Sequence, residues 1–255
     1  MRGIAPRILF LVRPICMPSP LFLQSHAFLC RGKRHWVILD ANRDKYHCVD
    51  RRQFETLGLL MTGWESTGCG DRGAAGVPAD ALALARELLS LNILSEHAAR
   101  AKDALPITYA LPTEAIDPDS PPCSRRSVWA HAISFFASSA RASRELRKQP
   151  FPLIVEQVRE RKARNAGQPR PFDLQRAVLL TSIFNRLRLF YPAAYDCLPD
   201  SLRLIHFLAW FGLFPDWVFG VIADPFEAHC WVQEGSVVLS DPVERVCAFT
   251  PIMYI

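Results

Sequence analysis

A proline-rich segment divides this chain into two parts. Between residues 103 and 124, five prolines occur among scattered acidic residues: Pro106, Pro112, Pro118, Pro121 and Pro122. Proline has no backbone N–H and is disfavoured in helix interiors and central strands, so this composition is typical of an extended linker. The sequence therefore predicts an N-terminal domain over residues 17–102, a linker over residues 103–126 and a C-terminal domain over residues 127–255.

The N-terminal part combines strand and helix patterns. The pattern from Leu21 to Val49 predicts short strands separated by polar turns. Arg51 to Met61 and Ala79 to Leu91 have helical periodicity, with a Gly-rich loop at residues 68–76 between them, and Asp80 is expected to cap the second helix. Three short strands followed by helices fit a small winged-helix-like domain.

The first sixteen residues have a different character. Their apolar run, Ile8 to Val12, is too short for a signal peptide, and Arg13-Pro14 closes it without a small-residue cleavage site. We expect residues 1–16 to form an irregular extension, with Met17 as an alternative start. No run reaches the eighteen or so apolar residues of a membrane helix, so no membrane association is predicted.

The eight cysteines are irregularly spaced and include no CxxC pair. In a chain of 255 residues this pattern favours reduced thiols in the cytoplasm over a disulfide framework, with one of the cysteines catalytic. A zinc site built from Cys197, His229, Cys230 and Cys247 is an alternative, although the paired ligand spacing is missing. We therefore predict neither a metal nor a cofactor.

Positive charge is concentrated ahead of Cys197. Residues 125–190 contain fourteen Lys or Arg against four Asp or Glu, whereas the whole chain carries a net charge of +5. This part is expected to form amphipathic helices at Ser127–Arg147, Phe151–Arg164 and Phe172–Phe190. A solvated helical face is the simplest role for the charge, and a docking surface for an acidic partner or nucleic acid is the alternative. Three side chains of the last helix are expected to face outward: Arg176, Arg186 and Arg188.

Cys197 is positioned for nucleophilic chemistry. It precedes a predicted helix from Leu198 to Phe211 with Pro199 in the first turn, where a missing N–H does no harm. Unpaired backbone N–H groups at such a helix start lower a thiol pKa and can hold a developing oxyanion. Asp196 and Asp200 oppose that effect on the pKa, so a histidine partner is required.

His229 and Asp241 supply that partner and its orienting acid. Both lie in extended runs flanking Glu234-Gly235-Ser236, a turn signal. With a three-residue loop they would face each other across a hairpin, with Cβ atoms about 4.5–5.5 Å apart. A two-residue loop would shift the pairing by one. A carboxylate so placed orients an imidazole and stabilises its protonated form.

Neighbouring residues are weaker candidates. Trp231 shares the strand face of His229 and is expected to wall the site, whereas Cys230 points to the opposite face and is expected to pack. His206 lies in an apolar helix and is expected to be buried. Asp224 and Glu227 are substitutes for Asp241.

The C-terminal residues resemble a known family. The motif residues are Cys197-Leu198-x-x-Ser201-Leu202, Gly212, Gly220-Val221, Pro225-Phe226, His229-x-Trp231-Val232, Asp241 and Thr250-Pro251. They resemble the lasso peptide biosynthesis B proteins, transglutaminase-like (papain-like) cysteine peptidases that remove the leader of a lasso precursor peptide. The resemblance covers roughly residues 127–255 and implies that Cys197 is the nucleophile, His229 the general base and acid, and Asp241 the orienting carboxylate. Cys230, Gln233 and Pro199-Asp200 depart from the usual pattern.

The N-terminal part is similar to the PqqD-like recognition domains fused to some of these peptidases. His35 to Asp40 and Asp44-x-Tyr46 carry the similarity. It implies that the leader adds as a strand beside Lys45–Val49, against the helix Ala79–Leu91. The candidate groove residues are Tyr46, Cys48, Leu84 and Leu88, each of which could equally be core. The expected fold is thus α+β, a small winged-helix recognition domain followed by a cysteine peptidase domain with a helical N-terminal part.

The resemblance implies a leader peptidase that binds a lasso precursor and passes the core to an ATP-dependent, asparagine-synthetase-like cyclase. Two alternatives stay open. An amine acceptor would make the same thioester chemistry a transglutamination. A non-catalytic winged-helix protein that binds peptide or DNA is the other. Nucleic acid is not expected, because Arg86 is the only base in the helix Ala79–Leu91.

Overall fold

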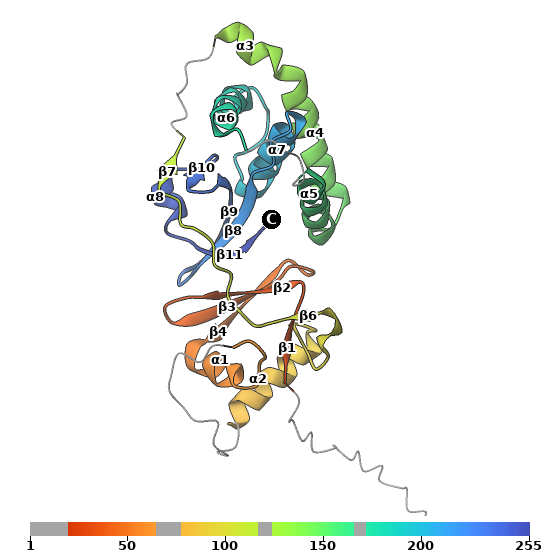
Figure 1. The fold of residues 1–255 in the computed structure, drawn as a ribbon, viewed down its shortest axis with the longest axis vertical. Coiled ribbons are helices and arrows are strands. Elements are labelled where there is room, and N and C mark those ends of the chain that lie inside the picture. Colours follow the sequence, from red (N-terminus) through yellow and green to blue (C-terminus); the bar gives the residue numbers. More distant parts are fainter. Residues whose placement is uncertain (1–19, 65–77, 117–123, 166–171) are drawn as a thin grey trace, which may run out of the picture.

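The computed structural model describes residues 20–64, 78–116, 124–165 and 172–255, which form two sheet-containing parts, one above the other in Figure 1. The predicted extension at residues 1–16, the Gly-rich loop at residues 68–76 and three of the linker prolines lie outside these residues. Within the described residues, no helix is both long enough and apolar enough to cross a membrane.

The N-terminal part is built as its strand and helix patterns predict. Strands β2 (Ala27–Arg31), β3 (His35–Asp40) and β4 (Lys45–Asp50) form an antiparallel sheet in that order, followed by helices α1 (Arg51–Gly58) and α2 (Ala79–Ser90). A second small sheet joins β1 (Phe22–Gln24) to β5 (Leu94–Ser95) and β6 (Ala101–Lys102), around the 3₁₀ turn Ala98–Arg100. The winged-helix assignment itself stays a prediction.

The capping prediction for α2 is wrong. Its N-cap is Pro78, which offers no side-chain hydrogen bond, and Asp80 lies within the first turn. There its carboxylate faces the positive end of the helix dipole, which is also favourable. The preceding helix has a true side-chain cap, because Asp50 Oδ1 accepts from the Arg52 N–H at 2.9 Å.

Both faces of the N-terminal sheet are buried. Leu29, Trp36 and Ile38 pack on the face that α1 and α2 cover. Cys30, Val37 and Leu39 face the other way and belong to the core of the C-terminal part. Successive strand residues point to opposite faces, so the unbroken apolar run in β3 is what burial on both faces requires. Figure 1 shows this sheet between the N-terminal helices and the C-terminal sheet.

The C-terminal part places a buried helix on a five-stranded sheet. The helices are α3 (Arg125–Ala130), α4 (Ala132–Lys148), α5 (Phe151–Asn165), α6 (Leu174–Arg188) and α7 (Cys197–Trp210). They are followed by β8 (Asp216–Ala223), β9 (Phe226–Glu234), β10 (Val237–Val238), α8 (Val243–Val246) and β11 (Thr250–Tyr254). Helix α7 packs on β9 and is covered by α4 and α6. The helix predicted over Ser127–Arg147 is two helices, α3 and α4, which meet at His131, and α8 and β11 were not predicted.

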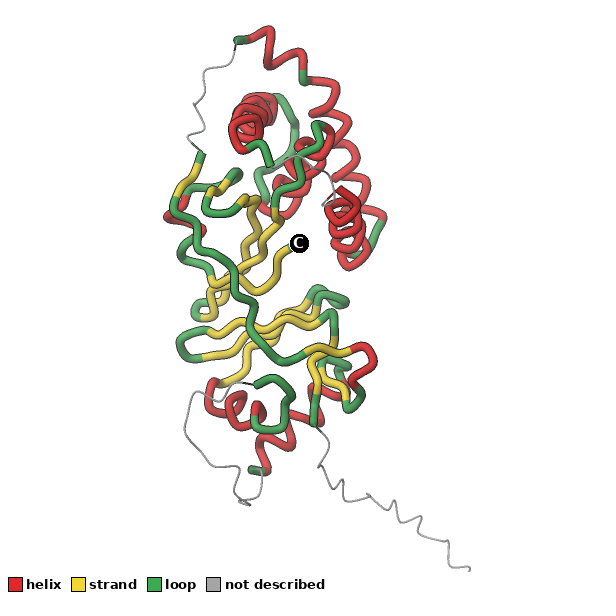
Figure 2. Tube along the Cα trace, viewed as in Figure 1, coloured by secondary structure: helices red, strands yellow, loops and turns green. Residues whose placement is uncertain are grey.

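Part of the proline-rich segment belongs to the C-terminal sheet. Strand β7 (Glu114–Ala115) pairs in parallel with β10, giving the order β11-β8-β9-β10-β7. The Tyr109 hydroxyl donates to Asp216 Oδ2 at 2.7 Å, which fixes the approach to β7. Figure 2 shows this loop crossing from the N-terminal sheet to the edge of the C-terminal one. The predicted linker therefore supplies an edge strand, a position that tolerates nearby proline.

Candidate active site

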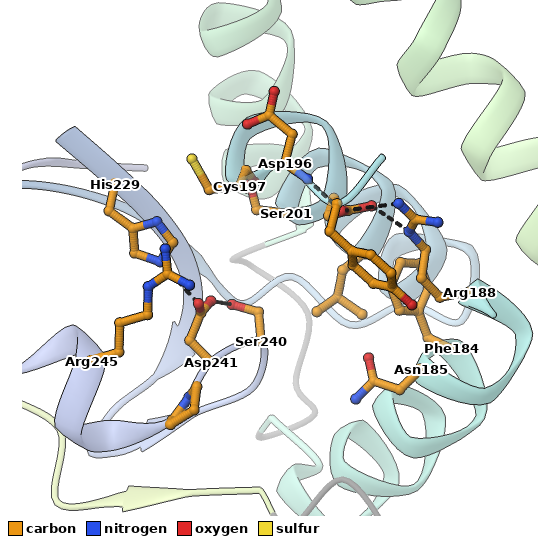
Figure 3. Close-up of a pocket in the computed structure, with 14 residues that line it drawn as sticks. Phe184, Asn185, Arg188, Asp196, Cys197, Ser201, His229, Ser240, Asp241 and Arg245 are labelled. Atoms are coloured by element: carbon orange, nitrogen blue, oxygen red, sulfur yellow. Dashed lines mark hydrogen bonds and ion pairs between the residues drawn. The ribbon is translucent and has the colours of Figure 1, made fainter. Parts of the chain in front are cut away.

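Cys197 is the first residue of α7. The helix begins after Asp196, whose carbonyl accepts from the Asp200 N–H at 3.0 Å, and Pro199 sits in the first turn as expected. The Cys197 side chain is half-buried and lines a pocket of about 350 Å³ together with His229 and Asp241 (Figure 3). The backbone N–H groups of Cys197 and Leu198 lie at the positive end of the helix dipole, next to the thiol.

The structure brings His229 and Asp241 into hydrogen-bonding contact. His229 Nε2 donates to Asp241 Oδ1 at 2.9 Å, and Asp241 Oδ2 also accepts from the Ser240 hydroxyl at 2.6 Å. Because Nε2 is bound to the carboxylate, Nδ1 is the ring nitrogen left for Cys197. The three side chains thus have the order of a nucleophile, a base and an orienting acid.

The strand register predicted for this contact is wrong. The loop has two residues, Gly235 and Ser236, so Val237 pairs with Glu234 and Val238 with Gln233. The ladder then ends, and the Val232 N–H donates to the Ser240 side chain at 2.9 Å. Asp241 therefore reaches His229 as the chain leaves the sheet, not as a cross-strand neighbour.

The pKa values of the three groups support an ion pair. The pKa of Cys197 is lowered to about 4, first by hydrogen bonding with Cys230 and then with His229, which outweigh burial. Burial alone would lower the pKa of His229, but hydrogen bonds with Asp241 and Cys197 raise it to about 9. Burial opposes ionisation of Asp241, yet bonds from His229 and Ser240 hold its pKa below the usual value. At neutral pH the pair is thiolate and imidazolium.

Cys230 lies closer to the chemistry than expected. It is buried against α7, with its Sγ 3.4 Å from the Ser201 hydroxyl, so the packing role is real. Its own thiol pKa is raised well above the usual value, first by burial and then by Cys197. Cys230 therefore stays protonated and donates to the Cys197 thiolate.

Two aromatic rings pack against the imidazole of His229. Trp231 stacks on it with ring centroids 6.1 Å apart, and Phe249 approaches to 5.2 Å. Trp231 is buried, and its indole N–H donates to Gln233 at 2.8 Å, so it supports the imidazole and does not line the pocket. Gly220 pairs with His229 on β8, where an added Cβ would lie 2.7 Å from the Trp231 ring. Only glycine lets the indole lie there.

The outward orientation predicted for Arg188 is wrong. Its side chain is only about 4% exposed, and its Nε donates to Asp200 Oδ1 at 2.6 Å. The same guanidinium donates to the carbonyls of Tyr191, Ala193 and Ala194, in the loop that leads to Cys197. Arg203 donates to the same Asp200 oxygen, also at 2.6 Å. The charge of Asp200 is therefore compensated, which removes the expected opposition to the thiolate. Arg176 is exposed, as predicted.

The four groove candidates of the N-terminal part do not come together. Tyr46 and Cys48 pair with Leu39 and Val37, so they face the C-terminal part, whereas α2 covers the other face of the sheet. Leu84 and Leu88 are buried in the N-terminal core on that second face. Tyr46 instead packs on Phe226 of β9, with ring centroids 5.4 Å apart. Burial first, and then the nearby charges of Asp44, Cys230 and Cys197, raise the pKa of Tyr46.

The remaining candidates have clear positions. His206 is buried, as predicted, with Nε2 2.6 Å from Glu145 Oε2. Asp224 and Glu227 are exposed and make no contact with His229. The five cysteines of the described ranges are free, and no group of three metal-ligating side chains occurs there. Asn185 and Arg245 also line the catalytic pocket, although neither belongs to a motif that the sequence would single out.

One of the comparisons with known proteins finds a match. Residues 141–254 match the transglutaminase-like superfamily, a span that includes Cys197, His229 and Asp241. No curated protein and no solved structure matches the chain. Enzymes of this superfamily are cysteine peptidases or acyltransferases that share a papain-like fold. Residues 141–254 thus form a transglutaminase-like superfamily domain.

Proposed function

We propose that this protein is a cysteine peptidase that removes the leader from a ribosomal lasso precursor peptide. The observation that carries the proposal is the single pocket in which Cys197, His229 and Asp241 meet, with His229 bonded to the carboxylate. The motif residues around that pocket, which resemble the lasso leader peptidases, supply the substrate class.

The reaction follows from the ionisation of the three groups. The Cys197 thiolate attacks the carbonyl carbon of the scissile amide, and the N–H groups at the start of α7 stabilise the oxyanion. The His229 imidazolium donates its proton to the leaving amine as the C–N bond breaks, which leaves a thioester. Neutral His229 then takes a proton from water, whose oxygen attacks the thioester and releases the leader acid. Asp241 holds the imidazole in place throughout.

The arrangement of the two parts suits a long peptide substrate. Strand β4 pairs only with β3 among the described residues, so its outer edge has unpaired backbone groups that can accept another strand. The leader would add along this edge. Because the sheet shares a core with the peptidase domain, a leader held there is also held at a fixed position relative to Cys197.

The released core would pass to an ATP-dependent, asparagine-synthetase-like cyclase. The basic residues that precede Cys197 are a suitable docking surface for an acidic patch on that partner. Exposed cations of this region, on α3 to α6, are Arg125, Arg126, Arg141, Arg144, Arg147, Lys148, Arg159, Arg164 and Arg176.

Mass spectrometry of a precursor digest tests the proposal. The substrate is a candidate lasso precursor peptide, incubated with and without a candidate asparagine-synthetase-like cyclase. We expect one cut at the leader–core junction, lost in Cys197→Ala and kept in Cys247→Ala, which removes another free cysteine of the same domain. An intact peptide with the cyclase present would contradict the peptidase assignment.

The same experiment separates hydrolysis from acyl transfer. A primary amine such as glycine ethyl ester is added in excess, and the mass of the released leader is measured again by mass spectrometry. Hydrolysis gives a leader acid of unchanged mass. A leader amide as the main product would instead favour the transglutaminase-type reaction, in which the amine, not water, accepts the acyl group.

A further inference from the structure

A second cavity adjoins the pocket that contains Cys197. This far cavity has a volume of about 470 Å³. Both hollows are lined by Asn185 of α6 and by Ser240, Asp241 and Pro242, which follow β10. Because they share these walls, the two hollows adjoin, and we call them together the groove. Asn185 and Asp241 stand on opposite sides of the first hollow (Figure 3).

The far end of the groove is built partly by the proline-rich segment. Its other lining residues are Thr113, Ala115, Ile116, Leu239, Val243 and Glu244. The first three lie on β7 or next to it, and most of the wall is small or apolar. Among the described residues that line it, the far cavity has two carboxylates and no cation, and Asp241 is already paired with His229. It therefore suits uncharged or basic side chains and disfavours acidic ones.

The chemistry of His229 gives the groove a direction. As general acid, His229 must lie within hydrogen-bonding reach of the leaving amine. Asp241, the bonded partner of His229, lines both hollows, so the far cavity lies on the His229 side of Cys197, which is the side of the leaving amine. On the other side of Cys197, Leu198 lines a cavity with Asn42, Arg43 and Asp44, from the turn before β4. The N-terminal sheet thus approaches from the acyl side.

We propose that the far cavity binds the peptide segment just C-terminal to the scissile bond, the first residues of the released core. Asn185 anchors it. Its side-chain amide points into the groove in Figure 3 and has no hydrogen-bond partner in the described ranges, so it can bind the backbone of an extended peptide. This inference rests on the proposed function, because it takes a peptide bond as the substrate.

A pair of substitutions on β7 tests the assignment. Ala115→Phe fills the far cavity from an exposed edge strand, and Glu114→Phe adds similar bulk at the neighbouring position, which does not line it. Two synthetic peptides are compared, the candidate precursor and a version that ends two residues after the scissile bond. Urea unfolding of each variant confirms that it is folded.

We expect the unmodified protein to cleave the full precursor with a kcat/KM about tenfold above that of the short peptide, the order that a filled pocket contributes. Ala115→Phe and Asn185→Ala should abolish that advantage, whereas Glu114→Phe should keep it. Equal efficiencies for the two peptides in the unmodified protein, or an equal loss on both peptides in Ala115→Phe, would overturn the inference. Cleavage of neither peptide by the unmodified protein would overturn the proposed function itself.

Discussion

The two main sheets of this molecule share a core but differ at their edges. In the C-terminal sheet, β9 carries His229 and is flanked on both sides, by β8 and by β10, with β7 added beyond. In the N-terminal sheet, β4 ends the order β2-β3-β4, and no other strand of the described residues pairs with its outer edge. An interior strand is fixed by two neighbours, whereas an edge strand can accept another chain. The proposed base His229 therefore lies on a strand whose C-terminal end has two neighbours, and it pairs itself with Gly220 of β8, whereas the expected leader site lies on a strand with one neighbour among the described residues.

The largest expected effect is at His229, on the interior strand β9 of the C-terminal sheet. His229→Ala should lower kcat/KM by on the order of 10⁴-fold, because the imidazolium both stabilises the thiolate and protonates the leaving amine. The pKa of Cys197 should rise from about 4, so alkylation by iodoacetamide at pH 6 should slow. His97→Ala, at an exposed position of the N-terminal part, is the control. An unchanged alkylation rate in His229→Ala would show that His229 does not stabilise the Cys197 thiolate.

The rigidity of the loop ahead of Cys197 depends on Arg188. Arg188→Met should lower the free energy of unfolding by about 3 kcal/mol, because Asp200 and three carbonyls lose a buried donor. Urea denaturation measures the change. Arg176→Met, on the exposed face of the same helix, should stay within about 0.5 kcal/mol of the unmodified protein. Similar losses in the two variants would contradict the structural role of Arg188.

The pH profile tests the orienting carboxylate. The active form combines a Cys197 thiolate, present above a pKa of about 4, with a His229 imidazolium, present below a pKa of about 9. Asp241→Asn removes the charge that raises the pKa of His229, so the alkaline limb of kcat/KM should move to lower pH. Activity at the optimum should fall roughly a hundredfold. Glu227→Gln, a nearby exposed carboxylate without contact to His229, should leave the profile unchanged.

The smallest expected effect is at the edge strand β4 of the N-terminal sheet. Leader binding along β4 should slow amide exchange in residues 45–50 by roughly tenfold, because the added strand protects outward N–H groups. Exchange in β9 should not change, since its neighbours are already present. Hydrogen exchange of the Cys197→Ala variant, which keeps the peptide intact, measures both strands at once. Protection in β9 without protection in β4 would place the leader elsewhere.

Local patterns were sufficient to predict most elements, whereas the contact of His229 with Asp241 was predicted from a strand register that the structure does not have. The helix start at Cys197 could be read from Pro199 in the first turn, and the strands around His229 from their apolar runs and the turn between them. These signals lie within a few residues of the feature that they predict.

The features that the sequence did not show depend on distant partners. Nothing near Arg188 distinguishes it from the exposed arginines around it, because its partner Asp200 lies on the next helix. Tyr46 and Cys48 were predicted to line a groove with α2, although the strand pairing turns them toward the C-terminal part. The register of the hairpin changes by one when its loop has two residues and not three. The sequence Glu234-Gly235-Ser236 is compatible with either loop length.

The two-sided burial of β3 has a consequence for how the molecule unfolds. Cutting the chain within the proline-rich segment would leave Cys30, Val37 and Leu39 facing water on one fragment and an uncovered apolar core on the other. Neither fragment could keep its stability, so heating should melt the intact protein in a single calorimetric transition. The prolines therefore mark a boundary in the sequence, but the parts on either side of it are expected to unfold together as one cooperative unit.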